Sequence, residues 1–285
     1  MDKEKINEFD FGIRSKTLNV VIPDKEGKLM EVEERLSAMP IEGPVPIGIV
    51  AKFIVDFNSL SENCFGNYCY KELIIQSENS KSMGIVFDSF YLSENAEFYI
   101  VNEEAHYLQG PIRAEYVSSP DKFISALMPG DKLKLLLVEP VDERGKSSIK
   151  GSKVSHGIVD FHGAGIARED CNFGFNCSAE CNNNVNCFSD YQTEANAVCL
   201  IVDMESGPNI MYYGSGSLIN NGKQDFEPII LTSGHTAPNL YLDHLQFVFH
   251  YRSPQCSPNT EGPLSIWVQG AQTLGNTVAE TDLNC

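Results

Sequence analysis

Short apolar runs separated by turn residues form the pattern of this chain from Ile47 onward. Six runs begin before residue 160, and they read IGIVAKFIVDF, KELIIQS, KSMGIVFDSFYL, AEFYIVNEE, KLKLLLVEP and SSIKGSKVSHGIVDF. Short strands at regular spacing, bounded by turn residues such as Pro129-Gly130-Asp131, are typical of an all-β sandwich or barrel. Helical periodicity is nearly absent. Residues 47–160 are therefore predicted to form a β-sandwich-like unit.

The same pattern divides the rest of the chain. Residues 1–46 are charged and weakly patterned, with one strand candidate at residues 18–23, and they are predicted to be an extended lead-in. Between residues 161 and 190 Gly, Asn and Cys replace the apolar runs, which predicts a cysteine-rich linker. Strand-like runs resume in residues 191–285, in a number that suits one small Greek-key barrel. The predicted fold class is all-β throughout.

Charge narrows the possible partners. Among 285 residues, 39 are acidic and 21 basic, giving a formal net charge of −18. Nucleic acids and anionic membranes attract basic surfaces, so neither is an expected partner. No stretch approaches the ~18 consecutive apolar residues of a membrane span, and the opening MDKEKINEFDFG lacks the apolar core of a signal peptide.

Cysteine spacing indicates the redox compartment. Four of the nine cysteines lie close together, at Cys171, Cys177, Cys181 and Cys187, with gaps of five, three and five residues and no histidine among them. Structural zinc sites prefer two to four residues between paired ligands, so disulfides are favoured over zinc. Disulfides imply secretion into an oxidising compartment, and with no export signal in the chain the N-terminus is expected to be incomplete. No metal or other cofactor is predicted.

Two further groups of residues have structural interpretations. Cys64 and Cys69 are separated by four residues, whereas a redox motif would have two, so they are expected to close a small disulfide loop. His156 and His162 lack ligand partners at matching spacing and are expected to be solvated turn histidines.

A histidine at the end of a predicted strand is the first candidate for chemistry. The segment GSGSLI, a turn-rich gap and PIILTSGH together predict a hairpin whose second strand ends near His235. Imidazole transfers protons near neutral pH, and as a base it needs a carboxylate on its other nitrogen. Asp282 is the candidate carboxylate, because Asp243 lies in a polar turn and is expected to be solvated.

These residues also carry a family resemblance. YGSGSLINN…PIILTSGHTA resembles the segment around the catalytic histidine of chymotrypsin-like (trypsin-like) serine endopeptidases, especially the bacterial lysyl-endopeptidase-like branch. CNNNVNC, FVFHYRSPQC and GAQTLGNTVAETD are similar to further segments of that branch, in the same order. LSENAEFYIVNEE and MPGDKLKLLLVEP resemble strands of its secreted pro-region. The similarity covers roughly residues 70–285.

The resemblance implies a function and a set of roles. His235 would be the general base of a Ser-His-Asp triad, with Asp282 orienting it for hydrolysis of a protein or peptide substrate. Cys187 would pair with Cys256. The chain would be part of a secreted zymogen, whose β-rich pro-region contacts the protease barrel within the chain.

Two departures from the family qualify this interpretation. The family has cysteines just before G-S-L and just after the histidine, where this chain has Ser215, or Gly214 in the alternative register, and Thr236. The family also continues past the aspartate into a second barrel that supplies the nucleophilic serine. The chain is therefore expected to be truncated before that barrel and inactive alone. A non-catalytic secreted β-sandwich binding protein with a degenerate protease remnant is the alternative hypothesis.

Overall fold

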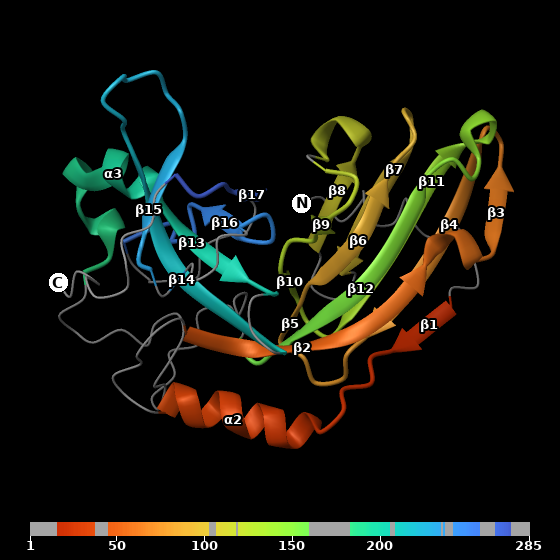
Figure 1. Ribbon diagram of the computed structural model, residues 1–285, viewed down its shortest axis with the longest axis horizontal. Coiled ribbons are helices and arrows are strands. Elements are labelled where there is room, and N and C mark those ends of the chain that lie inside the picture. The colour runs from red at the N-terminus through yellow and green to blue at the C-terminus, as the bar shows by residue number, and fades with distance from the viewer. Residues whose placement is uncertain are drawn as a thin grey trace. The chain divides into compact units, whose positions relative to one another are not determined.

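The computed structural model describes residues 16–37, 45–102, 107–117, 119–159, 183–205, 209–234, 236, 242–256 and 266–274. Strands dominate these residues, and the all-β prediction is confirmed (Figure 1). The chain forms two compact units. The first contains residues 1–25 and 50–158, and the second contains residues 26–49 and 159–285.

One sheet of the first unit is built from six strands. They are β1 (Lys16–Asn19), β3 (Glu62–Phe65), β4 (Tyr68–Gln76), β7 (Glu97–Asn102), β8 (Tyr107–Ile112) and β11 (Lys132–Pro140). The strand order is β1-β4-β11-β7-β8, and β3 pairs with the other end of β4. The pairings are antiparallel except for β1 with β4. Alternate residues of β11, such as Leu133, Leu135 and Leu137, are buried, as the period of a strand requires.

A second set of strands lies against this sheet. They are β5 (Ser82–Met83), β6 (Ile85–Tyr91), β9 (Phe123–Ile124), β10 (Met128–Pro129), β12 (Ser148–Gly157) and the second half of β2 (Val45–Asp56). Strand β12 pairs with β5 and β6, and β6 also pairs with β9.

Phenylalanine rings from the two sheets pack against one another between them. Phe98 of β7 contacts Phe87 and Phe90 of β6, with ring centroids 5.8 and 5.2 Å apart. Phe57, from the short 3-10 helix Phe57–Ser59, adds a contact at 5.4 Å. These edge-to-face ring contacts are the favourable geometry for aromatic pairs in a core. The first unit is thus a two-sheet sandwich with an aromatic centre.

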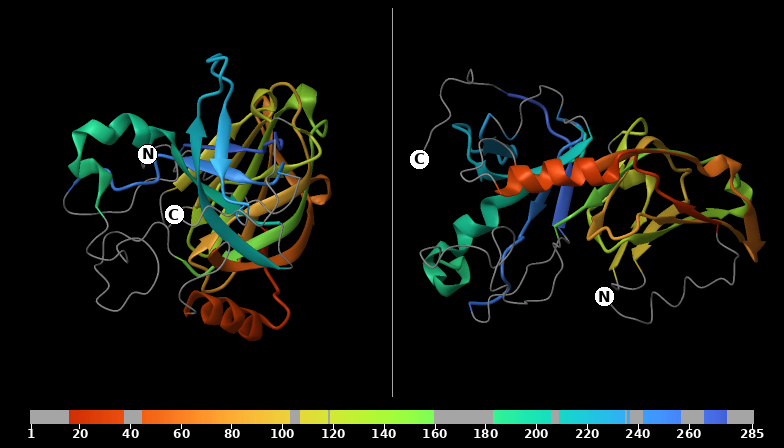
Figure 2. Two further views of the ribbon diagram at one scale, coloured as in Figure 1. Left: turned by 60° about the vertical axis from the view of Figure 1, so that its left-hand side comes forward. Right: turned by 90° about the horizontal axis from the view of Figure 1, so that it is seen from below.

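The second unit has an antiparallel sheet. Its strands are β13 (Val198–Asp203), β14 (Ile210–Ile219), β15 (Ile229–Thr232), β16 (Gln246–Phe249) and β17 (Ile266–Gln269). Strand β14 pairs with β13 along one edge, and with β15 and the start of β2 along the other. Strand β16 continues the sheet from β13 to β17. The short helix α3 (Gln192–Ala197) leads directly into β13, and Figure 2 shows this unit in two further orientations.

The N-terminal region differs from the prediction. Residues Lys25–Ser37 form the helix α2, where the sequence pattern predicts an extended lead-in. Its sequence, KEGKLMEVEERLS, is rich in good helix formers, with Glu26 in the first turn and Arg35 in the last, where each charge complements the helix dipole. Val32 is fully buried, and Arg35 donates a hydrogen bond to the Tyr212 hydroxyl at 2.9 Å. A search of the sequence for a continuous apolar stripe does not detect a helix that packs in this way.

The domain boundary also differs from a simple division near residue 160. Residues Val45–Ile49 belong to the second unit because they pair with β14, for example Ile49 opposite Ile210. The rest of β2 belongs to the sandwich. One strand therefore contributes to both units.

Candidate functional site

His235 and Asp282 lie outside the described residues, so the structure does not test whether they meet. The strand that leads to His235 is described. Strand β15 pairs antiparallel with β14, from Ile219 opposite Ile229 to Gly216 opposite Thr232. The hairpin predicted from GSGSLI and PIILT is confirmed, and it places His235 three residues beyond the end of β15.

The described residues on either side of His235 in the sequence make hydrogen bonds. The Thr236 amide donates a hydrogen bond to the Ser233 carbonyl at 3.1 Å, and the two hydroxyls lie 2.8 Å apart. Thr236 is 5% exposed. The Thr232 hydroxyl donates to the Ser215 carbonyl at 2.7 Å, which ties the end of β15 to β14. These bonds hold the backbone shortly before and just after His235.

Thr236 packs against Gly214. A Cβ atom at position 214 would lie 2.4 Å from Thr236 Cγ2 and 3.1 Å from Thr236 Cβ. Gly214, one of the two positions considered from the resemblance, therefore lies directly against the Thr236 side chain.

Two disulfides are present among the described residues, and they are the two pairs named from the sequence. Cys187 is bonded to Cys256, 69 residues away, and Cys64 is bonded to Cys69. Because Cys187 is in a disulfide, it is not available as a thiolate ligand for a four-cysteine zinc site with Cys171, Cys177 and Cys181. Those three cysteines lie outside the described residues.

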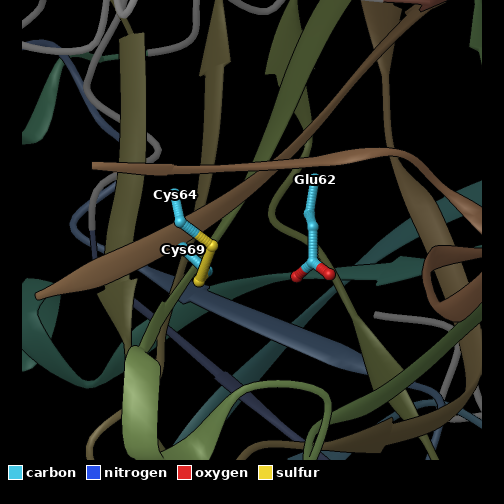
Figure 3. A group of neighbouring side chains, drawn as sticks. All are labelled: Glu62, Cys64 and Cys69. Atoms are coloured by element: carbon cyan, nitrogen blue, oxygen red, sulfur yellow. A yellow bond between two sulfur atoms is a disulfide. The ribbon is translucent and has the colours of Figure 1, made fainter. Parts of the chain in front are cut away.

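A group of potential ligands around the first disulfide can be excluded as a metal site. Among the described residues, Glu62, Cys64 and Cys69 bring three potential ligand atoms within 4.8 Å of one another (Figure 3). The two sulfur atoms are bonded to each other, and Glu62 accepts hydrogen bonds from Arg144. A disulfide has no thiolate to offer, so this group is a structural brace.

The thiol of Cys199 is not in a disulfide. It lies in β13 and is 2% exposed. Burial raises its pKa to about 11, against a smaller opposing effect of a backbone hydrogen bond with Gly216. A buried thiol with a raised pKa is a poor nucleophile. Cys199 therefore belongs to the core of the second unit, beside Ile201, Leu245 and Phe247.

Sequence reasoning missed a buried histidine–aspartate pair in the second unit. His244 Nε2 lies 3.4 Å from Asp203 Oδ1, and both side chains are 7% exposed. His244 Nδ1 lies 3.5 Å from Asp243, whose side chain is 67% exposed, as expected. Burial lowers the pKa of His244, but the hydrogen bond and charge of Asp203, with Glu205 and Asp243, outweigh it and raise the pKa. The feature of the sequence that could have indicated this pair is Asp203, an acidic residue at the end of an apolar strand.

The prediction for His156 is wrong. The sequence predicts a solvated turn, but His156 is 2% exposed at the end of β12 and hydrogen-bonded through Nδ1 to the Ser77 hydroxyl at 2.8 Å. Burial, with a smaller effect of Lys25, lowers the pKa of this imidazole to about 4. His162 lies outside the described residues.

The second unit thus has an antiparallel sheet, a long-range disulfide and hydrogen bonds between Ser233 and Thr236 after β15. A family model described as "Lysyl endopeptidase, C-terminal domain" matches residues 175–284. This part of the chain is therefore related to lysyl endopeptidases, which are serine proteases. The disulfides and this relation are consistent with an extracellular protein.

No curated protein matches the chain. The CBM36-1 domain of a multidomain xylanase from the hindgut metagenome of Trinervitermes trinervoides aligns with 40% of this chain and 99% of that domain, at 16% identity and a TM-score of 0.22. At this identity and score the alignment bears on neither fold nor function. Among the described residues, no helix has the length and apolar character needed to cross a bilayer.

Proposed function

We propose that the chain is part of a trypsin-like serine endopeptidase precursor in which His235 is the general base and Asp282 is the carboxylate that orients it. The observation that carries this proposal is the family match over residues 175–284, which includes both side chains. The β14–β15 hairpin and the Cys187–Cys256 disulfide support it, because both are features that the family resemblance leads one to expect.

The two side chains have distinct tasks in this chemistry. Asp282 accepts a hydrogen bond from Nδ1–H of His235, which leaves Nε2 unprotonated and able to remove the proton of a serine hydroxyl. The carboxylate then stabilises the imidazolium ion. The same imidazolium later donates its proton to the leaving amine of the peptide.

The interaction can be tested in the 285-residue chain without catalysis. We expect an NMR titration to show His235 with a raised pKa and with Nδ1 protonated in its neutral form. Asp282→Asn should lower that pKa and remove the low-field Nδ1 proton signal. Asp243→Asn is the matched control and should leave the His235 signals unchanged. A His235 titration insensitive to Asp282→Asn would contradict the proposed pair.

The proposal also places the nucleophilic serine in a second barrel encoded beyond Cys285. Reading the source gene past this codon should reveal G-[DS]-S-G-[GS] in the same frame. The protein encoded by that frame should react with a serine-directed fluorophosphonate probe, and His235→Ala should abolish the labelling. A long open frame without the motif would refute the full-enzyme version.

The sandwich is proposed to act as the pro-region of this precursor, assisting folding or covering the cleft before secretion and maturation. The substrate is a protein or peptide. A cleavage preference for lysine is part of this proposal through the family match alone. Assay of the encoded full-length protein on matched lysine, arginine and leucine peptides tests that preference.

A further inference from the structure

The outer face of one sandwich sheet is unusually aromatic. Tyr70 of β4 lies opposite Val138 of β11, which in turn lies opposite Glu97 of β7, and Tyr99 lies opposite Leu136. Tyr99, Val101 and Leu136 form a buried cluster with Tyr70, Leu108 and Val138 packed against it. The outer face of an antiparallel sheet is commonly polar where it meets water. Beside this buried cluster, Tyr68 is 48% exposed and Tyr70 is half-buried, so their rings are the part of this face that a ligand can reach.

A groove of about 800 Å³ lies over this face. Its apolar lining comes from Tyr68, Tyr70, Tyr99, Ala114 and Val138, and its polar lining from Glu94, Asn95, Glu97, Arg113 and Glu115. The volume is in the range of small-molecule and cofactor sites, which combine aromatic walls with a few fixed polar groups. All ten residues belong to the first unit.

The polar groups are held in place by one another. Arg113 donates from Nε and Nη2 to the same Glu97 oxygen, at 2.9 and 2.6 Å, and the Tyr99 hydroxyl donates to the other oxygen of Glu97. Burial and the bond to Glu97 raise the pKa of Tyr99 well above its ordinary value, so its hydroxyl remains protonated. Asn95 donates to Glu143 at 2.6 Å. Groups fixed in this way lose little conformational freedom when a ligand binds.

We infer that this groove binds a neutral oligosaccharide. Sugar hydroxyls both donate and accept hydrogen bonds, and the groove offers guanidinium donors and carboxylate acceptors side by side. The C–H face of a pyranose ring packs well on aromatic side chains, which are apolar in the ring and polar at the edge. Within the groove Arg113 is paired with Glu97, which leaves Glu94 and Glu115 as acceptors at the exposed rim. These carboxylates repel an anionic saccharide.

The inference goes beyond the proposed proteolysis and is tested independently of it. Isothermal titration of the full 285-residue chain should detect binding of at least one member of a panel of cellohexaose, xylohexaose, mannohexaose, chitohexaose and maltohexaose. Tyr68 is 48% exposed, so Tyr68→Ala should leave the fold intact while weakening binding about tenfold or more. Tyr68→Phe, which keeps the ring, should retain most of the affinity. Arg113→Gln should also weaken binding about tenfold.

Tyr91→Ala is the matched control, because Tyr91 is 51% exposed on β6 and does not line the groove. It should bind the saccharide as the unmodified chain does. The inference is overturned if no hexasaccharide binds, or if binding is unaffected by both Tyr68→Ala and Arg113→Gln. Binding of hexalysine with no binding of any hexasaccharide would also overturn it, and would identify the groove as a site for cationic peptides.

Discussion

His156 and His244 are both buried, yet their surroundings shift their pKa values in opposite directions. His156 has a neutral hydrogen-bond partner, Ser77, so burial disfavours its charged form. His244 lies between the carboxylates of Asp203 and Asp243, which favour the charged form. Ser77 and Asp203 cannot be inferred as partners from the residues beside each histidine, because both come from distant segments of the sequence.

The first unit should lose stability as pH falls. The folded-state pKa of His156, about 4, lies below the ordinary value of 6.5, so the stabilisation is full above pH 6.5 and is lost as pH falls toward 4. The gap between these two pKa values corresponds to about 3 kcal/mol in the free energy of unfolding. Denaturant unfolding between pH 4 and 7 measures it. In His156→Gln this part of the pH dependence should disappear, and an unchanged slope would contradict the assignment.

The second unit, in contrast, should lose stability as pH rises. The folded-state pKa of His244 is raised, so its contribution is full below about pH 6.5 and is lost as pH rises through the raised value. Unfolding of the second unit between pH 6 and 9, followed by denaturant titration, should show this loss. Asp203→Asn should reduce it, because the carboxylate that favours the imidazolium is then gone. Asp121→Asn, at an exposed residue of the first unit, provides the control.

At the scale of elements, the β14–β15 hairpin packs against Thr236, which follows β15 in the sequence. Gly214 of β14 leaves the space that Thr236 occupies, so the pair should accept a disulfide with a small backbone adjustment. We expect Gly214→Cys with Thr236→Cys to form this bond, as shown by mass mapping of unreduced peptides. Gly222→Cys with Thr236→Cys should not, because no heavy atom lies within 4 Å of a Cβ at position 222.

Most strands could be predicted from the sequence, and the exceptions have physical causes. β11 and β13 are apolar runs whose burial is evident from composition, since Leu135 and Ile201 face cores. Helix α2 was missed because one buried residue, Val32, and a cation–π contact of Arg35 with Tyr212 replace a full apolar stripe. The division of β2 was missed because β14, the partner of its first half, lies more than 150 residues away in the sequence.

At the scale of the whole molecule, the candidate catalytic residues come from sequence similarity alone. His235 and Asp282 remain predictions, whereas the β14–β15 hairpin, the Ser233–Thr236 hydrogen bonds and the Cys187–Cys256 bond are observed. The aromatic groove of the sandwich was not predicted. Its tyrosines come from β4 and β7, which are not neighbours in sequence and join only through β11.

The residues N-terminal to the sandwich should remain bound to the second unit after the chain is cut. Val45–Ile49 pair with β14, and Arg35 bonds to Tyr212. A protease site engineered within residues 160–182 and then cleaved should yield two fragments that co-elute in size-exclusion chromatography. Pro46→Asp with Ile49→Asp should promote their separation, while Ile54→Asp, at a 73% exposed position, should not. Immediate separation of the unmodified fragments would contradict the shared strand.

Maturation of such a precursor would then need two events. A single cut after the sandwich would leave a nicked heterodimer whose N-terminal chain still completes the neighbouring sheet, much as a donated strand does. Withdrawal of that strand from β14 would be a distinct step, so cleavage alone would not separate the two chains.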